Sequence, residues 1–218
     1  TGGGDVNGDG FADVLVSARQ GDPNGGQSGE VYLLHGNSSL PGALSLGSLS
    51  FRGVQLNGSA ANDRAGDALA VVGDFNDDGR LDLATSDNGH SRIDIFLQRK
   101  PEDRKPEIVT RDINEFSGSV LFAHQKLIVD KAISDIVAGD FNGDGKADLA
   151  YWGSPDRLVL RLQQAEGKWG RISLPLEGVT TATQILAAGD LNGDKRDDIV
   201  VLGKRETLVL LQGEDGKL

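Results

Sequence analysis

The stretch DFNGDGKADL, residues 140–149, decides how the rest of this chain is interpreted. Three other stretches repeat its pattern: DVNGDGFADV at residues 5–14, DFNDDGRLDL at 74–83 and DLNGDKRDDI at 190–199. Each has Asp at positions one, five and nine, Asn at position three and an aliphatic residue at position ten. Twelve carboxylates in one repeated spacing indicate a shared structural role rather than ordinary surface charge.

This spacing of oxygen-bearing side chains suits a calcium ion. Calcium takes six to eight oxygen ligands at about 2.3–2.6 Å, and a loop that supplies oxygens from alternate residues can surround it. Positions one, three, five and nine would supply side-chain oxygens, and position seven a backbone carbonyl. We therefore predict up to four calcium sites, one per loop, formed by Asp5, Asn7, Asp9, Phe11 and Asp13; by Asp74, Asn76, Asp78, Arg80 and Asp82; by Asp140, Asn142, Asp144, Lys146 and Asp148; and by Asp190, Asn192, Asp194, Arg196 and Asp198.

The loops begin like an EF-hand loop but end differently. An EF-hand requires Glu at position twelve and a helix on each side, whereas position twelve is Thr85 in the second loop and Tyr151 in the third. The flanking residues are apolar and β-branched, which favours strands. We therefore expect each loop to join two antiparallel strands. The alternative, a metal-free Asp/Asn/Gly turn, accounts for one such loop more easily than for four.

The four loops are not predicted to bind equally well. Position six requires a sharp turn that Gly allows, and the fourth loop has Lys195 there. A non-Gly residue in this conformation costs roughly 1 kcal/mol, and the Lys adds a cation, although Asp197 is expected to compensate in part. The first loop follows Thr1–Gly4, so its preceding strand is expected to be missing. We predict that loops two and three bind best and loop four weakest.

Composition limits the classes of function. The 33 acidic and 22 basic residues give a net charge of −11, and four bound calcium ions would offset most of it. The sequence shows no basic stripe for nucleic acid, and it has no Cys for a disulfide or thiolate site. No apolar run approaches the ~18 residues of a membrane-spanning helix, and there is no Met. We expect a part or a processed form of a longer chain.

The loops start 69, 66 and 50 residues apart, which is typical of repeat architectures. Short strand patterns lie between them, about four per period, as in the blades of a β-propeller. The predicted fold is all-β, with about 3.7 four-stranded antiparallel blades over residues 1–66, 67–132, 133–182 and 183–218. Strands are expected at residues 12–18, 29–36, 49–56, 68–75, 81–87, 92–99, 119–129, 135–141, 148–153, 157–164, 171–176, 185–191, 198–204 and 207–214.

The repeats resemble the FG-GAP and VCBS-type repeats of integrin-α-like calcium-binding β-propellers. Ser17-Ala18-Arg19 stands where that family usually has Gly-Ala-Pro, and Ala65-Gly66 stands in place of Phe-Gly. The resemblance covers nearly the whole chain and implies calcium in the hairpin between the first two strands of each blade. Such propellers usually have six to eight blades. The missing blades are expected in the rest of a longer chain, with self-assembly of copies as the alternative.

Other chemistry-bearing residues favour structural roles. His35, His90 and His124 are far apart and form no metal-binding motif, and no P-loop or nucleophile elbow is present. Trp152 and Trp169 could stack on sugars, but packing between blades is the favoured interpretation. No catalytic residue and no further cofactor is predicted.

Together these features predict a secreted or cell-surface module that is stabilised by calcium, is not an enzyme and functions in adhesion or in binding an extracellular protein or glycan. No nucleic-acid partner and no membrane insertion is expected. One alternative is a carbohydrate-binding lectin, which a glycan array would distinguish. Another is the propeller portion of a polysaccharide-degrading enzyme, whose catalytic site would lie outside this chain.

Overall fold

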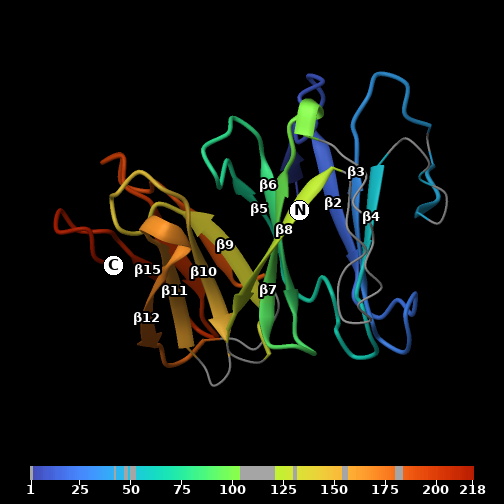
Figure 1. Cartoon of the computed structure of the whole chain (residues 1–218). Coiled ribbons are helices and arrows are strands. Elements are labelled where there is room, and N and C mark those ends of the chain that lie inside the picture. The colour runs from blue at the N-terminus through green and yellow to red at the C-terminus, as the bar shows by residue number, and fades with distance from the viewer. Residues whose placement is uncertain are drawn as a thin grey trace.

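The computed structural model describes residues 2–41, 43–46, 49, 53–103, 121–129, 132–153, 157–179 and 184–218. Four antiparallel sheets succeed one another along these residues (Figure 1). Their strands are β1 (Gly2–Gly4), β2 (Asp13–Ala18), β3 (Glu30–Leu34) and β4 (Gly53–Asn57); β5 (Leu69–Gly73), β6 (Asp82–Asp87), β7 (Arg92–Gln98) and β8 (Phe122–Ile128); β9 (Asp135–Gly139), β10 (Asp148–Gly153), β11 (Arg157–Gln163) and β12 (Trp169–Pro175); and β13 (Leu186–Gly189), β14 (Asp198–Leu202) and β15 (Thr207–Leu210). The described helices are the short η3 (Pro101–Asp103) and η4 (Ala165–Gly167), and neither has the length or apolarity to cross a bilayer.

Each sheet is a meander in which strands adjacent in sequence are adjacent in space. This is the arrangement of a propeller blade, so the predicted all-β propeller fold is confirmed as a partial propeller. The described residues form three four-stranded blades and one three-stranded blade. The predicted blade boundaries fall in the connections between sheets and stay predictions. Residues 50–52 and 119–120 of two predicted strands lie outside the described part of the chain.

One prediction about the first blade was wrong. The first loop does have a preceding strand, because β1 pairs antiparallel with β2 and places Gly2 opposite Val14. The strand was missed because three consecutive glycines carry no apolar alternation. Backbone hydrogen bonds alone are sufficient to add them to the sheet edge.

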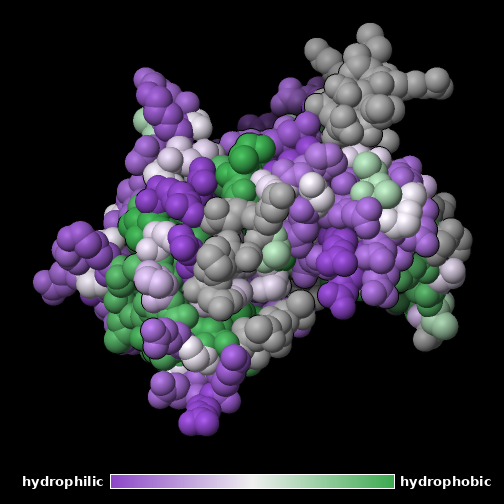
Figure 2. Space-filling view, turned by 90° about the horizontal axis from the view of Figure 1, so that it is seen from below, coloured by the Kyte–Doolittle hydropathy of each residue, from purple (hydrophilic) through white to green (hydrophobic). Residues whose placement is uncertain are grey.

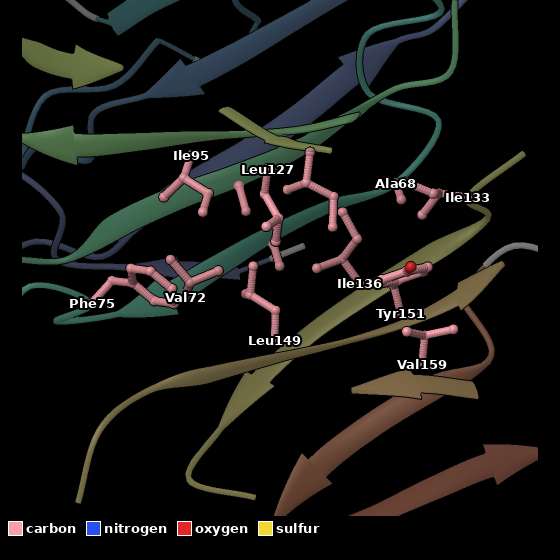
Figure 3. Packing of buried hydrophobic residues seen from close by; sticks show 13 residues of the cluster. Ala68, Val72, Phe75, Ile95, Leu127, Ile133, Ile136, Leu149, Tyr151 and Val159 are labelled. Carbon is pink, nitrogen blue, oxygen red and sulfur yellow. The ribbon is translucent and has the colours of Figure 1, made fainter. Parts of the chain in front are cut away.

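The hydrophobic core lies between consecutive sheets. One cluster joins the first and second sheets, another the second and third, and a third the third and fourth. Figure 3 shows the middle cluster, where Ile95 and Leu127 of the second sheet meet Leu149 and Tyr151 of the third. Because the inner sheets pack on both faces, every residue of β6 and β10 is buried.

The outer face of the fourth sheet is apolar and exposed. Leu191, the second residue of the fourth loop, is 54% exposed, whereas the corresponding Val6, Phe75 and Phe141 are each at most 3% exposed. Leu202, Val209 and Leu211 are also exposed. Figure 2 shows hydrophobic surface on the side where Figure 1 places the C-terminal sheets. In the first three loops a following sheet lies over the second residue, and among the described residues none does so in the fourth.

Candidate metal centre

The four acidic loops occupy the same place in every sheet. Each connects the first strand to the second, between β1 and β2, β5 and β6, β9 and β10, and β13 and β14. These strand pairs are antiparallel, which confirms the predicted hairpin context. The loops therefore lie along one edge of the molecule, the upper edge in Figure 1.

The first Asp of each loop accepts hydrogen bonds from the backbone of its own loop. In the third loop, Asp140 Oδ1 accepts the N–H of Gly143 at 2.7 Å and Asp140 Oδ2 accepts the N–H of Gly145 at 2.7 Å. The bond from the sixth residue recurs at Asp5, Asp74 and Asp190. The first carboxylate thus sets the curvature of the loop.

Positions three and five are also held by backbone amides. Asn142 Oδ1 accepts the N–H of Asp144 at 2.8 Å, and Asp144 Oδ1 accepts the N–H of Lys146 at 2.9 Å. Both bonds recur in the other three loops. Backbone amides therefore hold these side-chain oxygens in place in every loop.

The sixth residue adopts the predicted left-handed turn in all four loops. Its φ is +90° at Gly10, +85° at Gly79, +82° at Gly145 and +67° at Lys195. Glycine enters this region without steric cost, whereas a side chain there is strained by about 1–2 kcal/mol. The fourth loop keeps the shape of the others at the expense of its stability.

The ninth-position Asp has the clearest structural role. Asp148 is fully buried; its Oδ2 accepts the N–H of Phe141 at 3.1 Å, and its Oδ1 accepts the N–H of Gln163 at 2.6 Å. The carboxylate thereby ties the start of the loop to the end of the third strand. Equivalent pairs of bonds reach Asp13 from Val6 and Gly36, Asp82 from Phe75 and Gln98, and Asp198 from Leu191 and Gln212.

The pKa values of two ninth-position Asp residues reflect their burial and the nearby negative charges of their loops. Burial raises the pKa of Asp148 to about 7, because the charged carboxylate loses hydration. Backbone hydrogen bonds oppose this rise, and the negative charges of Asp144 and Asp140 add to it. Asp82 behaves in the same way, and its pKa is raised to about 6. A cation in the loop would relieve this repulsion.

The donor set fits a hard divalent cation such as calcium. All side-chain donors at positions one, three, five and nine are oxygens, which calcium prefers. A carboxylate oxygen has two lone pairs, so one N–H bond leaves capacity for an ion. When bound, calcium would be held by these residues and would neutralise their charge. The backbone carbonyls at position seven stay predicted ligands.

Comparison with protein families identifies the repeat. A model described as FG-GAP-like repeat matches residues 74–151 and 140–201, and a model described as FG-GAP repeat matches residues 1–34. The chain belongs to the FG-GAP repeat family. Each FG-GAP-like match spans two consecutive acidic loops, and such repeats form propeller-like binding modules that are typically non-catalytic. Comparison with curated proteins gave no match.

The fourth loop of this FG-GAP chain differs from the others in its charges. The guanidinium of Arg196 pairs with Asp194, the fifth-position ligand, and its Nε donates to the backbone carbonyl of Gln212 at 3.0 Å. In the second loop the corresponding Arg80 lies 3.9 Å from Asp78 Oδ2. A cation held firmly against a ligand would compete with calcium, and the weakness of loop four stays a prediction.

Asp197 makes a contact that the sequence did not predict. Its Oδ2 accepts the N–H of Asp140 at 2.8 Å, so it reaches the third loop, and its partial compensation of Lys195 stays a prediction. In the second blade the corresponding residue, Leu81, packs into the core between the first two sheets. In the second and fourth loops position eight therefore faces the preceding blade, and Asp197 makes a hydrogen bond there.

Three glutamines at the ends of third strands were not predicted as functional from the sequence. Gln98, Gln163 and Gln212 donate both to the ninth Asp of their own blade and to the loop of the preceding blade. A signal was present, because each follows a Leu and lies 14–16 residues after the ninth Asp. Spacing alone does not reveal that the side chain reaches back to another blade.

The aromatic and histidine residues are used in packing. Trp152 is 6% exposed in the core, and Trp169 stacks on Phe75 with ring centroids 5.8 Å apart. The favoured interpretation of packing between blades is thus supported over sugar stacking. His124 Nε2 lies 2.7 Å from Asp94 Oδ1, and its ring stacks on Phe96.

Within the described residues, one group of ligand-type side chains meets outside the loops. The Nδ1 atom of His90 lies 3.2 Å from Asp63 Oδ1 and 3.0 Å from Asp87 Oδ2. The Arg92 guanidinium lies 2.9 Å from the same Asp87 oxygen and already balances its charge. The group is therefore an ion-pair network that connects the first and second blades.

Proposed function

We propose that this FG-GAP chain is a calcium-stabilised, non-catalytic module that binds a protein or glycan ligand outside the cell. The observation that carries the proposal is the fourfold repetition of one oxygen-rich loop, each closed by a buried ninth-position Asp, along one edge of a propeller. Oxygen ligands and crowded negative charge are what a calcium ion requires.

Calcium would act through stability. A ligand that binds only the folded state adds about 1.4 kcal/mol per site when its concentration is tenfold over Kd. Extracellular calcium modules bind at roughly 10⁻⁴–10⁻³ M, and cytosolic calcium would leave such sites empty. This range supports a secreted or cell-surface location.

The partner would bind a surface held rigid by the filled loops. The exposed apolar face of the fourth sheet also supports association with the rest of a longer chain or with another copy, because it corresponds to a face that packs on a neighbour in the other sheets. We therefore favour adhesion to a protein or glycan ligand as the function that calcium would support in this module.

Thermal unfolding with millimolar calcium and with a chelator tests the proposal, and light scattering gives the mass in each condition. Four filled sites should raise Tm by about 10 °C or more, since 1 kcal/mol shifts Tm by about 2–4 °C at this chain length. Magnesium should give a smaller shift, because it dehydrates reluctantly. An unchanged Tm would contradict calcium stabilisation.

A further inference from the structure

Three glutamine side chains connect the acidic loops of neighbouring blades. Gln98 Nε2 donates to the backbone carbonyl of Val6 in the first loop at 2.6 Å. Gln163 Nε2 donates to the carbonyl of Phe75 in the second loop at 3.2 Å, and also to that of Ala147 at 3.0 Å. Gln212 Nε2 donates to the carbonyl of Asp140 in the third loop at 2.8 Å. We call these three residues the glutamine links.

Each link is attached at its other end to a predicted calcium ligand. The backbone N–H of Gln98 donates to Asp82 Oδ1 at 2.7 Å. The Val6 residue that its side chain contacts donates its own N–H to Asp13 Oδ2 at 2.8 Å. One glutamine and one loop residue therefore separate the ninth-position carboxylates of two neighbouring loops.

The same path continues through the other blades. Gln163 lies between Asp148 and Phe75, and the Phe75 N–H donates to Asp82 Oδ2 at 3.0 Å. Gln212 lies between Asp198 and the peptide group that joins Asp140 to Phe141. The Phe141 N–H donates to Asp148 Oδ2 at 3.1 Å. All four ninth-position carboxylates thus belong to one hydrogen-bonded series.

Burial makes these links stiff. Gln98 is 7% exposed and Gln212 is 1% exposed, while Gln163 is half-buried. Loss of a hydrogen-bond partner is costly for a buried polar group, so the links at Gln98 and Gln212 do not open freely. A change in the position of one ninth-position carboxylate must then move the loop of the preceding blade.

We propose that the glutamine links couple calcium binding at neighbouring loops, so that an ion in one loop raises the affinity of the loop before it. The inference rests on the proposed calcium function. Coupling between binding sites is reciprocal, so the earlier loop favours the later one equally. In the first blade Gly36 occupies the place of the glutamine, and the series begins at Gln98.

The second loop has a built-in reporter for this test. Trp169 stacks on Phe75, the second residue of that loop. The chain has two tryptophans, so Trp152→Phe leaves Trp169 as the only one. Its fluorescence during a calcium titration would report filling of loop two, and calorimetry would give the total number of ions bound.

The experiment is a double-mutant cycle on the full chain in the Trp152→Phe background. Asp144→Ala removes the fifth-position ligand of the third loop, and Gln163→Ala removes the link between loops two and three. With Gln163 in place, Asp144→Ala should weaken calcium binding at loop two by about fivefold to tenfold, the lower range for coupled sites. In the Gln163→Ala background, Asp144→Ala should leave the calcium midpoint of the Trp169 fluorescence titration unchanged. Gln164→Ala is the matched control, because Gln164 is exposed.

The possible outcomes are distinct. An equal effect of Asp144→Ala in both backgrounds, or no effect in either, overturns the coupling while calorimetry still shows bound calcium. No calcium bound by the Trp152→Phe parent overturns the proposed function itself. Circular dichroism checks folding; if Gln163→Ala does not fold, Gln163→Met keeps the side-chain length without the donor and replaces it in the cycle.

Discussion

Gly66 lies directly against Ser17: a Cβ atom on Gly66 would come within 2.6 Å of the Ser17 Cβ. The backbone N–H of Gly66 also donates to Thr85 Oγ1 at 2.9 Å, and its φ is +88°. Gly66 belongs to the Ala-Gly pair at the family's Phe-Gly position, and Ser17 begins the segment at the Gly-Ala-Pro position. The two signature segments of the repeat thus form one contact between the first and second blades.

Gly66→Ala should destabilise the chain by about 3 kcal/mol, because it combines a strained φ with overpacking. Urea denaturation would measure the loss. Gly167→Ala is the matched control: Gly167 also has a positive φ, of +69°, but a Cβ there meets nothing within 4 Å. It should cost only about 1 kcal/mol. Equal losses would show that the contact with Ser17 is unimportant.

Two aspartates of the third loop should differ in the absence of calcium. Asp148→Ala leaves the buried N–H of Phe141 and the part-buried N–H of Gln163 without an acceptor, which should cost about 2–4 kcal/mol. Asp144→Ala breaks an exposed bond to Lys146 and should cost less than about 1 kcal/mol. Both are measured by urea denaturation in chelator. If Asp144→Ala lowered the free energy of unfolding more than Asp148→Ala, the ninth-position Asp would not have the larger structural role.

The loops should also differ in calcium affinity. Asp78→Ala and Asp144→Ala should each remove a stronger site than Asp194→Ala, since Asp194 is already paired with Arg196. Calorimetric titration of the single variants would rank the sites, and equal losses would contradict the ranking.

Lys195→Gly should strengthen the fourth loop. It removes a cation and the strain of a side chain at φ +67°, so stability in chelator should rise by about 1 kcal/mol. Calcium affinity at that loop should rise as well. Lys146→Gly in the third loop is the control. It also removes a Lys, but the turn of that loop is already formed by the neighbouring Gly145. An equal gain from both would assign the effect to charge alone.

Asp135 should make stability depend on pH. It is buried, and its carboxylate accepts the N–H groups of Ile136 and Leu186 at 2.9 and 2.7 Å. Burial raises the pKa of Asp135 above its ordinary value of 3.8. The folded state then binds the proton more tightly than the unfolded state, so stability from protonation is present below pH 3.8 and is lost as pH rises through the raised pKa.

The free energy of unfolding of the native protein minus that of Asp135→Asn should therefore increase as pH falls through this window. Taking the difference between the two proteins removes the contributions of other titrating groups. Urea denaturation across the acidic range measures it. A difference that decreases toward low pH would show that the hydrogen bonds from Ile136 and Leu186 outweigh the burial.

The loops and their flanking strands could be predicted because their information is local. Ten consecutive residues contain the ligands, the turn and the start of the next strand, so the sequence around Asp140 predicts a hairpin without reference to the rest of the chain. β1 was missed because it pairs through backbone alone. Gln98 was missed because its side chain bonds Val6, 92 residues away. The partner of Asp197, 57 residues away, depends on how two blades meet.

The direction of the glutamine links has a consequence for synthesis. Each side chain reaches back to a loop that lies 92, 88 or 72 residues nearer the N-terminus. A ribosome makes the chain from that end, so each of the first three loops is complete well before the glutamine that binds it has been translated. A blade can then reach its final form only after the third strand of its successor has emerged, and the propeller matures one blade behind the growing chain.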